Sequence, residues 1–233
     1  MIFYKVTSTE PVIQIVTDKL TERLSMGERV FWLVTGGTAV GVQVAVGKLL
    51  KAQDTSRLTI ALMDERYGPV GHPDSNWQQL LDAGFDVPGA TLIPILRGKD
   101  RDASMAGFAK ALTENFAAAD YSLGQFGIGP DGHTAGILPG SPYINSTDLA
   151  VSYADSEATQ QFTPGVYRDK DRITMTAAAI AQLDDAIVCA LGESKHIPLD
   201  QLEQTIPLAE EPAQALKLAK NLSVYNDYKG ELL

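Results

Sequence analysis

A chain of 233 residues with 45% hydrophobic composition can bury a substantial core, so we expect one domain over residues 1–233. The formal net charge of −10 argues against a nucleic-acid or anionic-membrane partner, because both need clustered Lys and Arg. No stretch approaches the roughly 20 apolar residues of a membrane span, and residues 1–10 do not resemble a signal peptide, so we expect a cytoplasmic protein.

Apolar runs of strand length alternate with segments of helical period along most of the chain. We expect strands at 30–35, 58–63, 91–96, 121–128, 172–176, 185–191 and 221–225, and helices up to about residue 50, at 103–118, at 176–183 and after residue 192. This alternation is typical of βαβ units and predicts an α/β fold, a mainly parallel sheet with helices on both faces. The least regular region, 139–171, is expected to be a long loop or a small excursion beside the site.

Residues 35–38, Thr-Gly-Gly-Thr, follow the first of these strands. In an open parallel sheet, ligands bind beyond the carboxyl ends of the strands. Gly36 and Gly37 let the backbone turn and expose its amides, and Thr35 and Thr38 add hydroxyl donors at the start of a helix. The segment predicts a phosphate-binding loop, although a tight turn with a threonine helix cap has the same pattern.

Residues 64–77 form a second polar cluster, in an expected loop directly after a strand. Arg66 could bind a phosphate or carboxylate through two parallel hydrogen bonds. Further candidate site residues are Asp64, His72 and Asn76. A loop histidine is often only solvated, and Ser75 or Asn76 could instead cap a helix beginning near residue 77.

Residues 127–140 contain the glycine spacing of a dinucleotide-binding loop, with glycines at 127, 129 and 132. We reject a dinucleotide on chemical grounds. Asp131 would place a carboxylate against a pyrophosphate, Pro130 removes an amide donor, and Pro139 ends any helix after barely two turns. The motif therefore does not predict a nucleotide cofactor.

The same segment suits acid–base chemistry. Gly132 and its neighbouring glycines allow close backbone approach, Asp131 can orient an imidazole two residues on, and His133 has the intrinsic pKa of a general base. A lone histidine after a strand is often structural. A histidine held between glycines and beside an aspartate favours a catalytic role.

Two cations border the expected sheet near the end of the chain. Arg172 opens the strand 172–176, and Lys195 follows Gly192 behind the strand 185–191. Either alone could be a solvated surface charge. Together with the loop 35–38, they predict a phosphate site.

These segments, in this order and at these spacings, resemble the 6-phosphogluconolactonase family. They are Thr-Gly-Gly-Thr at 35–38, the runs 64–76 and 127–140, and Arg-Ile-Thr-Met-Thr at 172–176 followed by Gly-Glu-Ser-Lys at 192–195. The family, grouped with the glucosamine-6-phosphate isomerases, has a modified doubly wound (Rossmann-like) α/β fold. The resemblance implies hydrolysis of 6-phospho-D-glucono-1,5-lactone to 6-phosphogluconate in the oxidative pentose phosphate pathway, without a metal or an organic cofactor.

The resemblance also implies roles for particular residues. His133 would activate water for attack on the lactone carbonyl and return the proton to the ring oxygen, while Asp131 holds it in place. Amides of the glycine-rich loop are the expected oxyanion donors. The residues expected to bind substrate, chiefly its phosphate, are Gly36, Gly37, Thr38, Arg66, Arg172 and Lys195. The expected partner is a small phosphorylated sugar lactone, and the expected state is a monomer or weak homo-oligomer.

This chain departs from the family at several positions. The first loop usually reads Ser-Gly-Gly-Ser followed by Thr-Pro, where this chain has Thr35 to Thr38 followed by Ala39 and Val40. The related deaminases carry an acidic residue where this chain has Leu138, and usually tyrosine where it has Arg66. Both differences favour ester hydrolysis over amine release.

A non-catalytic sugar-phosphate sensor is a third alternative, from another class of protein. Sensors of this fold tend to carry a DNA-binding module or to lose the base. This chain keeps His133, and its charge is unfavourable for DNA.

Overall fold

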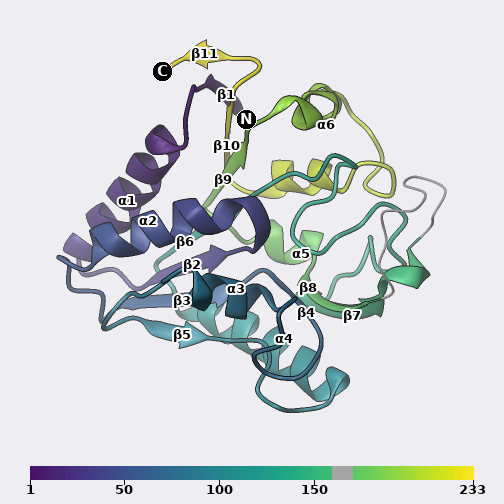
Figure 1. The fold of residues 1–233 in the computed structure, drawn as a ribbon, viewed down its shortest axis with the longest axis horizontal. Coiled ribbons are helices and arrows are strands. Elements are labelled where there is room, and N and C mark those ends of the chain that lie inside the picture. The colour runs from purple at the N-terminus through teal and green to yellow at the C-terminus, as the bar shows by residue number, and fades with distance from the viewer. Residues whose placement is uncertain (159–169) are drawn as a thin grey trace.

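The computed structural model describes residues 1–158 and 170–233, whose strands form two sheets (Figure 1). The strands are β1 (Ile2–Lys5), β2 (Val30–Val34), β3 (Leu58–Leu62), β4 (Asp64–Arg66), β5 (Thr91–Ile93), β6 (Tyr121–Phe126), β7 (Ala150–Ala154), β8 (Asp171–Met175), β9 (Asp185–Ala190), β10 (Asn221–Asn226) and β11 (Glu231–Leu232). The α-helices are α1 (Glu10–Ser25), α2 (Val40–Leu50), α3 (Asn76–Asp82), α4 (Arg101–Ala118), α5 (Ala177–Ile180) and α6 (His196–Leu202). Short 3₁₀ helices are η1 (Gly37–Ala39), η2 (Asp155–Glu157), η3 (Glu193–Lys195) and η4 (Pro212–Leu218).

The larger sheet has eight parallel strands in the order β11-β1-β10-β9-β6-β2-β3-β5. Every residue of β2 and β6 is buried. A parallel strand covered on both faces needs such a continuous apolar run, which explains why β2 reads Val-Phe-Trp-Leu-Val. The predicted α/β class, a mainly parallel sheet with helices on both faces, is confirmed.

The order of the strands reverses between β2 and β6. From β2 the chain proceeds through α2 toward β3 and β5, and α2 contacts both α1 and α3. From β6 it proceeds the other way, toward β9 and β10, and there α5 and α6 pack with η4. Because crossovers between parallel strands are right-handed, these two groups of helices cover opposite faces. The loops after β2 and β6 therefore separate and leave a crevice between them.

The smaller sheet is antiparallel, in the order β4-β8-β7, and it corrects two expectations. The segment 172–176 is not a strand of the parallel sheet, and the expected loop 64–77 begins with the strand β4. Met63 joins the sheets, since its N–H donates to Val34 and its carbonyl accepts from the N–H of Met175, both at 2.8 Å. Residues 172–176 alternate polar and apolar side chains, a pattern typical of a half-buried strand, but the pattern does not show which strands it pairs with.

Other element boundaries also differ from those expected. The strand expected at 91–96 ends at Ile93, because Pro94 has no N–H to donate to a neighbouring strand. The helix expected at 176–183 covers only Ala177–Ile180. The irregular region 139–171 contains β7 and η2, although residues 159–169 lie outside the described part of the chain. Among the described residues, no helix has the length and apolar character needed to cross a membrane.

Candidate active site

The loop after β2 is shaped by its two glycines. Gly37 adopts a φ of +67°, a conformation that favours glycine, and a Cβ atom on Gly36 would lie 2.1 Å from Oδ1 of Asn76. The loop leads through η1 into α2, and neither helix has a side-chain cap. The threonine-cap alternative is therefore wrong. Thr35 instead donates to Oδ1 of Asp64 at 3.4 Å.

The loop after β6 is closed by its own backbone. Gly129 N–H donates to the carbonyl of His133 at 2.8 Å, and Gly132 N–H donates to the carbonyl of Gly129 at 3.0 Å. Gly132 adopts a φ of +78°, and a Cβ atom on Gly129 would lie 2.1 Å from Nδ1 of His133. The glycines are thus required for the imidazole to pack against the main chain of its own loop.

His133 is held by Asp131. Nδ1 of His133 lies 2.5 Å from Oδ1 of Asp131, whose side chain is 4% exposed, against 36% for that of His133. A carboxylate only accepts hydrogen bonds, so Nδ1 carries the proton and Nε2 is free to accept one. Burial opposes the charge of Asp131, but its hydrogen bond with His133 and the charge of His133 hold its pKa below the ordinary value.

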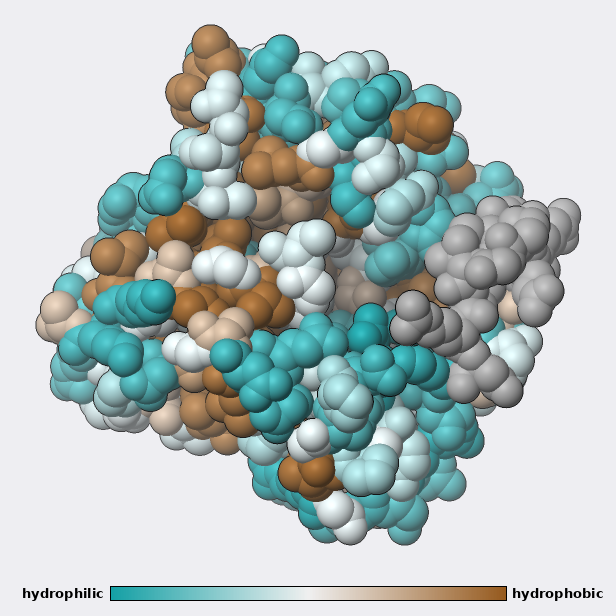
Figure 2. Space-filling view, in the orientation of Figure 1, coloured by the Kyte–Doolittle hydropathy of each residue, from teal (hydrophilic) through white to brown (hydrophobic). Residues whose placement is uncertain are grey.

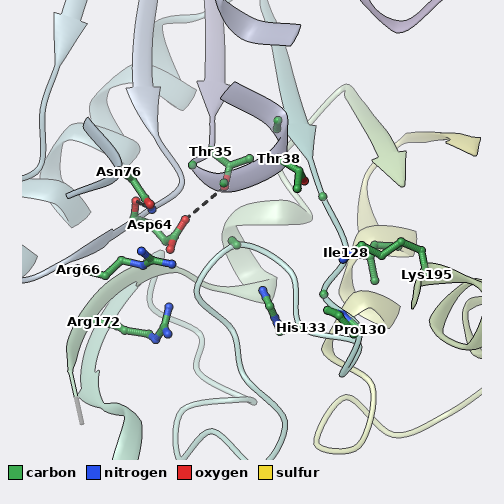
Figure 3. Close-up of a pocket in the computed structure, with 16 residues that line it drawn as sticks. Thr35, Thr38, Asp64, Arg66, Asn76, Ile128, Pro130, His133, Arg172 and Lys195 are labelled. Atoms are coloured by element: carbon green, nitrogen blue, oxygen red, sulfur yellow. Dashed lines mark hydrogen bonds between the residues drawn. The ribbon is translucent and has the colours of Figure 1, made fainter. Parts of the chain in front are cut away.

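A pocket of about 200 Å³ lies where these loops meet the small sheet. Figure 2 shows this face of the molecule hollowed near its middle, with hydrophilic residues along the lower side of the hollow. The residues that line the pocket (Figure 3) are Thr35, Gly36, Gly37, Thr38, Ala39, Asp64, Arg66, Asn76, Gly127, Ile128, Gly129, Pro130, His133, Ala135, Arg172 and Lys195.

Two arginines form one side of the pocket. Arg66 and Arg172 are directly opposite each other on β4 and β8, an arrangement of like charges that an anion would stabilise. Both Nε and Nη2 of Arg172 donate to the buried carboxylate of Asp155, the second at 3.0 Å. Burial opposes the charge of Arg172, but the bond and charge of Asp155 raise its pKa above the ordinary value. Arg66 donates to the carbonyl of Asp74 at 3.3 Å, while its buried Nε has no partner among the described residues.

Lys195 lies on the other side of the pocket from the arginines, with His133 between them in the view of Figure 3. It ends η3, which follows Gly192 at a φ of +102°. Burial lowers the pKa of Lys195, partly offset by the charge of Asp131. Within residues 1–158 and 170–233, Lys195 makes no ion pair, so its charge is available to a ligand.

The structure brings most of the predicted site residues together. Those that line the pocket are Thr35, Gly36, Gly37, Thr38, Asp64, Arg66, Asn76, His133, Arg172 and Lys195. Asp131 and Gly132 do not line the pocket. Asp131 contacts His133, and Gly132 lies against Glu211. His72 also lies outside the pocket, where its Nε2 is 2.9 Å from the carbonyl of Arg66, and Ser75 caps α3.

Sequence reasoning missed several residues of the site. Asp155 lies within the irregular region 139–171, and no motif connects it with Arg172. Ala135 lines the pocket with a φ of +48°, which is uncommon for a residue other than glycine and has no sequence signal. Among the described residues, no group of three or more His, Cys, Asp or Glu side chains could hold a metal ion.

Comparison with known proteins places the chain in a family. The model for "Glucosamine-6-phosphate isomerases/6-phosphogluconolactonase" matches residues 7–224. A 6-phosphogluconolactonase of Pseudomonas aeruginosa is 29% identical, over 79% of this chain and 76% of its own length. One from Caulobacter vibrioides is 27% identical, over 82% of this chain and 81% of its own length.

Solved structures show the same fold. A 6-phosphogluconolactonase from Shewanella baltica has a TM-score of 0.78 at 19% identity and covers 97% of both chains. A monomeric glucosamine-6-phosphate deaminase has a TM-score of 0.78 at 20% identity and covers 98% of both chains. Neither likeness separates hydrolysis from deamination. The match over residues 7–224 nevertheless confirms the resemblance drawn from the motifs, and this chain belongs to the glucosamine-6-phosphate isomerase/6-phosphogluconolactonase family.

Proposed function

We propose that this protein hydrolyses 6-phospho-D-glucono-1,5-lactone to 6-phosphogluconate, a reaction of the oxidative pentose phosphate pathway. The observation that carries the proposal is the His133–Asp131 pair, which directs a free imidazole nitrogen into a pocket that also contains Arg66, Arg172 and Lys195. The names of the relatives from Pseudomonas aeruginosa and Caulobacter vibrioides support the same activity.

The proposed chemistry begins at His133. Nε2 takes a proton from water as the water oxygen bonds to the lactone carbonyl carbon, which gives a tetrahedral oxyanion. Asp131 stabilises the imidazolium that forms, since its carboxylate accepts from Nδ1. When the oxyanion collapses, the bond from the carbonyl carbon to the ring oxygen breaks and Nε2 returns the proton to that oxygen. The product is the open-chain acid.

The loop geometry limits which groups can donate hydrogen bonds to the oxyanion. We expected amides of the glycine-rich loop in this role, but those of Gly129 and Gly132 already donate within the loop. The proposal therefore draws the donors from other groups that line the pocket outside the loop 35–38, which is assigned to the phosphate.

The substrate phosphate is proposed to bind at the loop 35–38 and the surrounding cations. The chain as a whole carries a net charge of −10, yet Arg66, Arg172 and Lys195 all border one pocket. Asp155, and Asp64 in the lining of the pocket, offset only part of this charge. A local cluster of cations in an acidic protein favours an anionic ligand at that place.

Leu138 favours hydrolysis over the deamination of glucosamine 6-phosphate. The related deaminases carry an acidic residue at the corresponding position. Here the side chain is 3% exposed and packs with Tyr153 and Ala158 in a small apolar cluster. A carboxylate introduced there would lose its hydration, so this chain is built for a neutral group beside the loop.

A coupled assay tests the proposal. The lactone is generated in situ, and 6-phosphogluconate is detected with and without the protein, because this lactone also hydrolyses spontaneously. We expect a clear acceleration over the spontaneous rate and no ammonia from glucosamine 6-phosphate. Ammonia release with no acceleration of lactone hydrolysis would reverse the assignment, and tight phosphosugar binding without either reaction would indicate a sensor.

The other expectations drawn from the sequence stay predictions. They concern a single domain, a cytoplasmic location, no nucleic-acid partner, and a monomer or weak homo-oligomer. Size-exclusion chromatography with light scattering would test the last of these.

A further inference from the structure

Glu211 lies directly behind the loop that carries His133. A Cβ atom on Gly132 would lie 2.1 Å from Oε2 and 2.8 Å from Oε1 of Glu211, so the carboxyl group packs on the main chain of the loop. Ala213 N–H also donates to the carbonyl of Gly132 at 2.9 Å. The segment 211–213, at the start of η4, is thus bound to the segment 129–133. Glu211 itself does not line the pocket.

Two carboxyl oxygens in this contact lack donors. Oε1 of Glu211 and Oδ2 of Asp131 are both buried, and neither has a hydrogen-bond partner among the described residues. Glu211 is only 2% exposed. Two neighbouring carboxyl groups without donors cannot both be ionised at low cost, so one of them keeps a proton. Asp131 is the one that ionises, because its other oxygen accepts from His133.

The groups around Glu211 support this division. Burial, followed by the charge of Asp131, raises the pKa of Glu211 to about 7. Lys217 opposes this shift, but its amine is used by the carbonyl of Gln204 at 2.6 Å and by Oε1 of Gln214 at 2.7 Å. On the pocket side, the charged groups facing Asp131 are His133 and Lys195.

We propose that Glu211 is a positioning residue for lactone hydrolysis, and that its proton decides whether one negative charge or two lie behind His133. The proposal rests on the proposed function in taking His133 as the base. With Glu211 neutral, Asp131 alone stabilises the imidazolium. With Glu211 ionised, the second charge favours the imidazolium further and makes His133 harder to deprotonate. The protons of Glu211 and His133 are then coupled, and a neutral side chain at position 211 removes this coupling.

The experiment is an NMR titration of the full chain without substrate. The Cε1 resonance of His133, assigned with a His133→Asn variant, is followed from pH 5 to pH 9 in the wild type, in Glu211→Gln and in Glu210→Gln. We expect Glu211→Gln to move the midpoint of His133 down by roughly 0.3 pH units or more and to sharpen it to a single step. Glu210 is exposed, so Glu210→Gln serves as the matched control and should leave the curve unchanged.

The kinetic measurement uses the same variants. The acid limb of the kcat/KM profile should move down with the NMR midpoint in Glu211→Gln and stay in place in Glu210→Gln. Unchanged titration of His133 in a folded Glu211→Gln variant would overturn the proposal. If that variant fails to fold, ¹³C detection of the Glu211 carboxyl carbon in the wild type decides, and full ionisation already at pH 5 would overturn it.

These outcomes are separable from failure of the proposed function. The titration is measured without turnover, so coupling between Glu211 and His133 can be present even if the protein does not hydrolyse the lactone. Conversely, lactone hydrolysis that requires His133 but shows no coupling would reject only the role of Glu211.

Discussion

The two sides of the pocket are built in different ways. The base and its orienting carboxylate come from one short loop, residues 127–133, which is closed by its own backbone. The cations come from β4, β8 and η3, which are far apart in the sequence and belong to different parts of the fold. The first arrangement depends mainly on local conformation, and the second depends on how two sheets meet. Substitutions on the two sides should therefore fail in different ways.

The largest expected effect is on the base side. His133→Ala removes the group that takes the proton from water, so kcat should fall by about 10²- to 10⁴-fold while KM changes little. His72→Ala is the matched control, because His72 lies outside the pocket and its ring bonds to the backbone carbonyl of Arg66. An unchanged kcat in His133→Ala, after subtraction of spontaneous hydrolysis, would show that His133 is not the base.

Gly129→Ala tests whether the loop conformation itself places the base. The new Cβ would lie 2.1 Å from Nδ1 of His133 and 2.4 Å from Oδ1 of Asp131, so the imidazole must shift. A displacement of about 1 Å costs up to roughly 10²-fold in rate, and we expect kcat to fall by about 10- to 100-fold. Gly107→Ala in α4, where a Cβ meets nothing within 4 Å, should keep full activity. Steady-state kinetics on both variants decides whether the close approach matters.

The cation side should affect binding more than turnover. Lys195→Met removes a charge that has no ion pair among the described residues, so KM should rise about tenfold, with kcat and stability nearly unchanged. Arg172→Met should raise KM as well, but it leaves Asp155 buried and unpaired and should cost about 3 kcal/mol of stability. Urea denaturation alongside kinetics separates the two. Equal stability losses in both variants would contradict the different roles of these cations.

The smallest expected effect is a dependence of stability on pH that comes from Glu211, behind the loop that carries the base. The pKa of Glu211 rises on folding from 4.5 to about 7, so the folded chain holds this proton more tightly than the unfolded chain. The contribution is fully present below pH 4.5 and is lost as pH rises through about 7. Relative to Glu211→Gln, the wild type should lose free energy of unfolding between pH 5 and pH 8. Urea denaturation at both pH values measures this, and parallel curves would contradict it.

The difference between local contacts and contacts distant in sequence explains which features the sequence could predict. The Asp131–His133 contact is local, since the two residues are two positions apart in one turn, and spacing alone predicted it. The strand–helix alternation likewise predicted the parallel sheet, because buried strands such as β2 are continuous apolar runs. The antiparallel pairing of β4 with β8 is not local, and the expected position of 172–176 was wrong. Asp155 and Glu211 were missed because their partners lie 17 and about 80 residues away along the chain.

The single residue between β3 and β4 fixes how the cation side is oriented. Met63 is fully buried and carries main-chain hydrogen bonds to both sheets, and Arg66 follows it by three positions. Side chains alternate along a strand, so inserting or deleting one residue here would turn Arg66 away from the pocket and Glu65 toward it. Surface loops elsewhere can change length with little consequence, whereas at this junction the length of the chain is itself a requirement for recognising an anion.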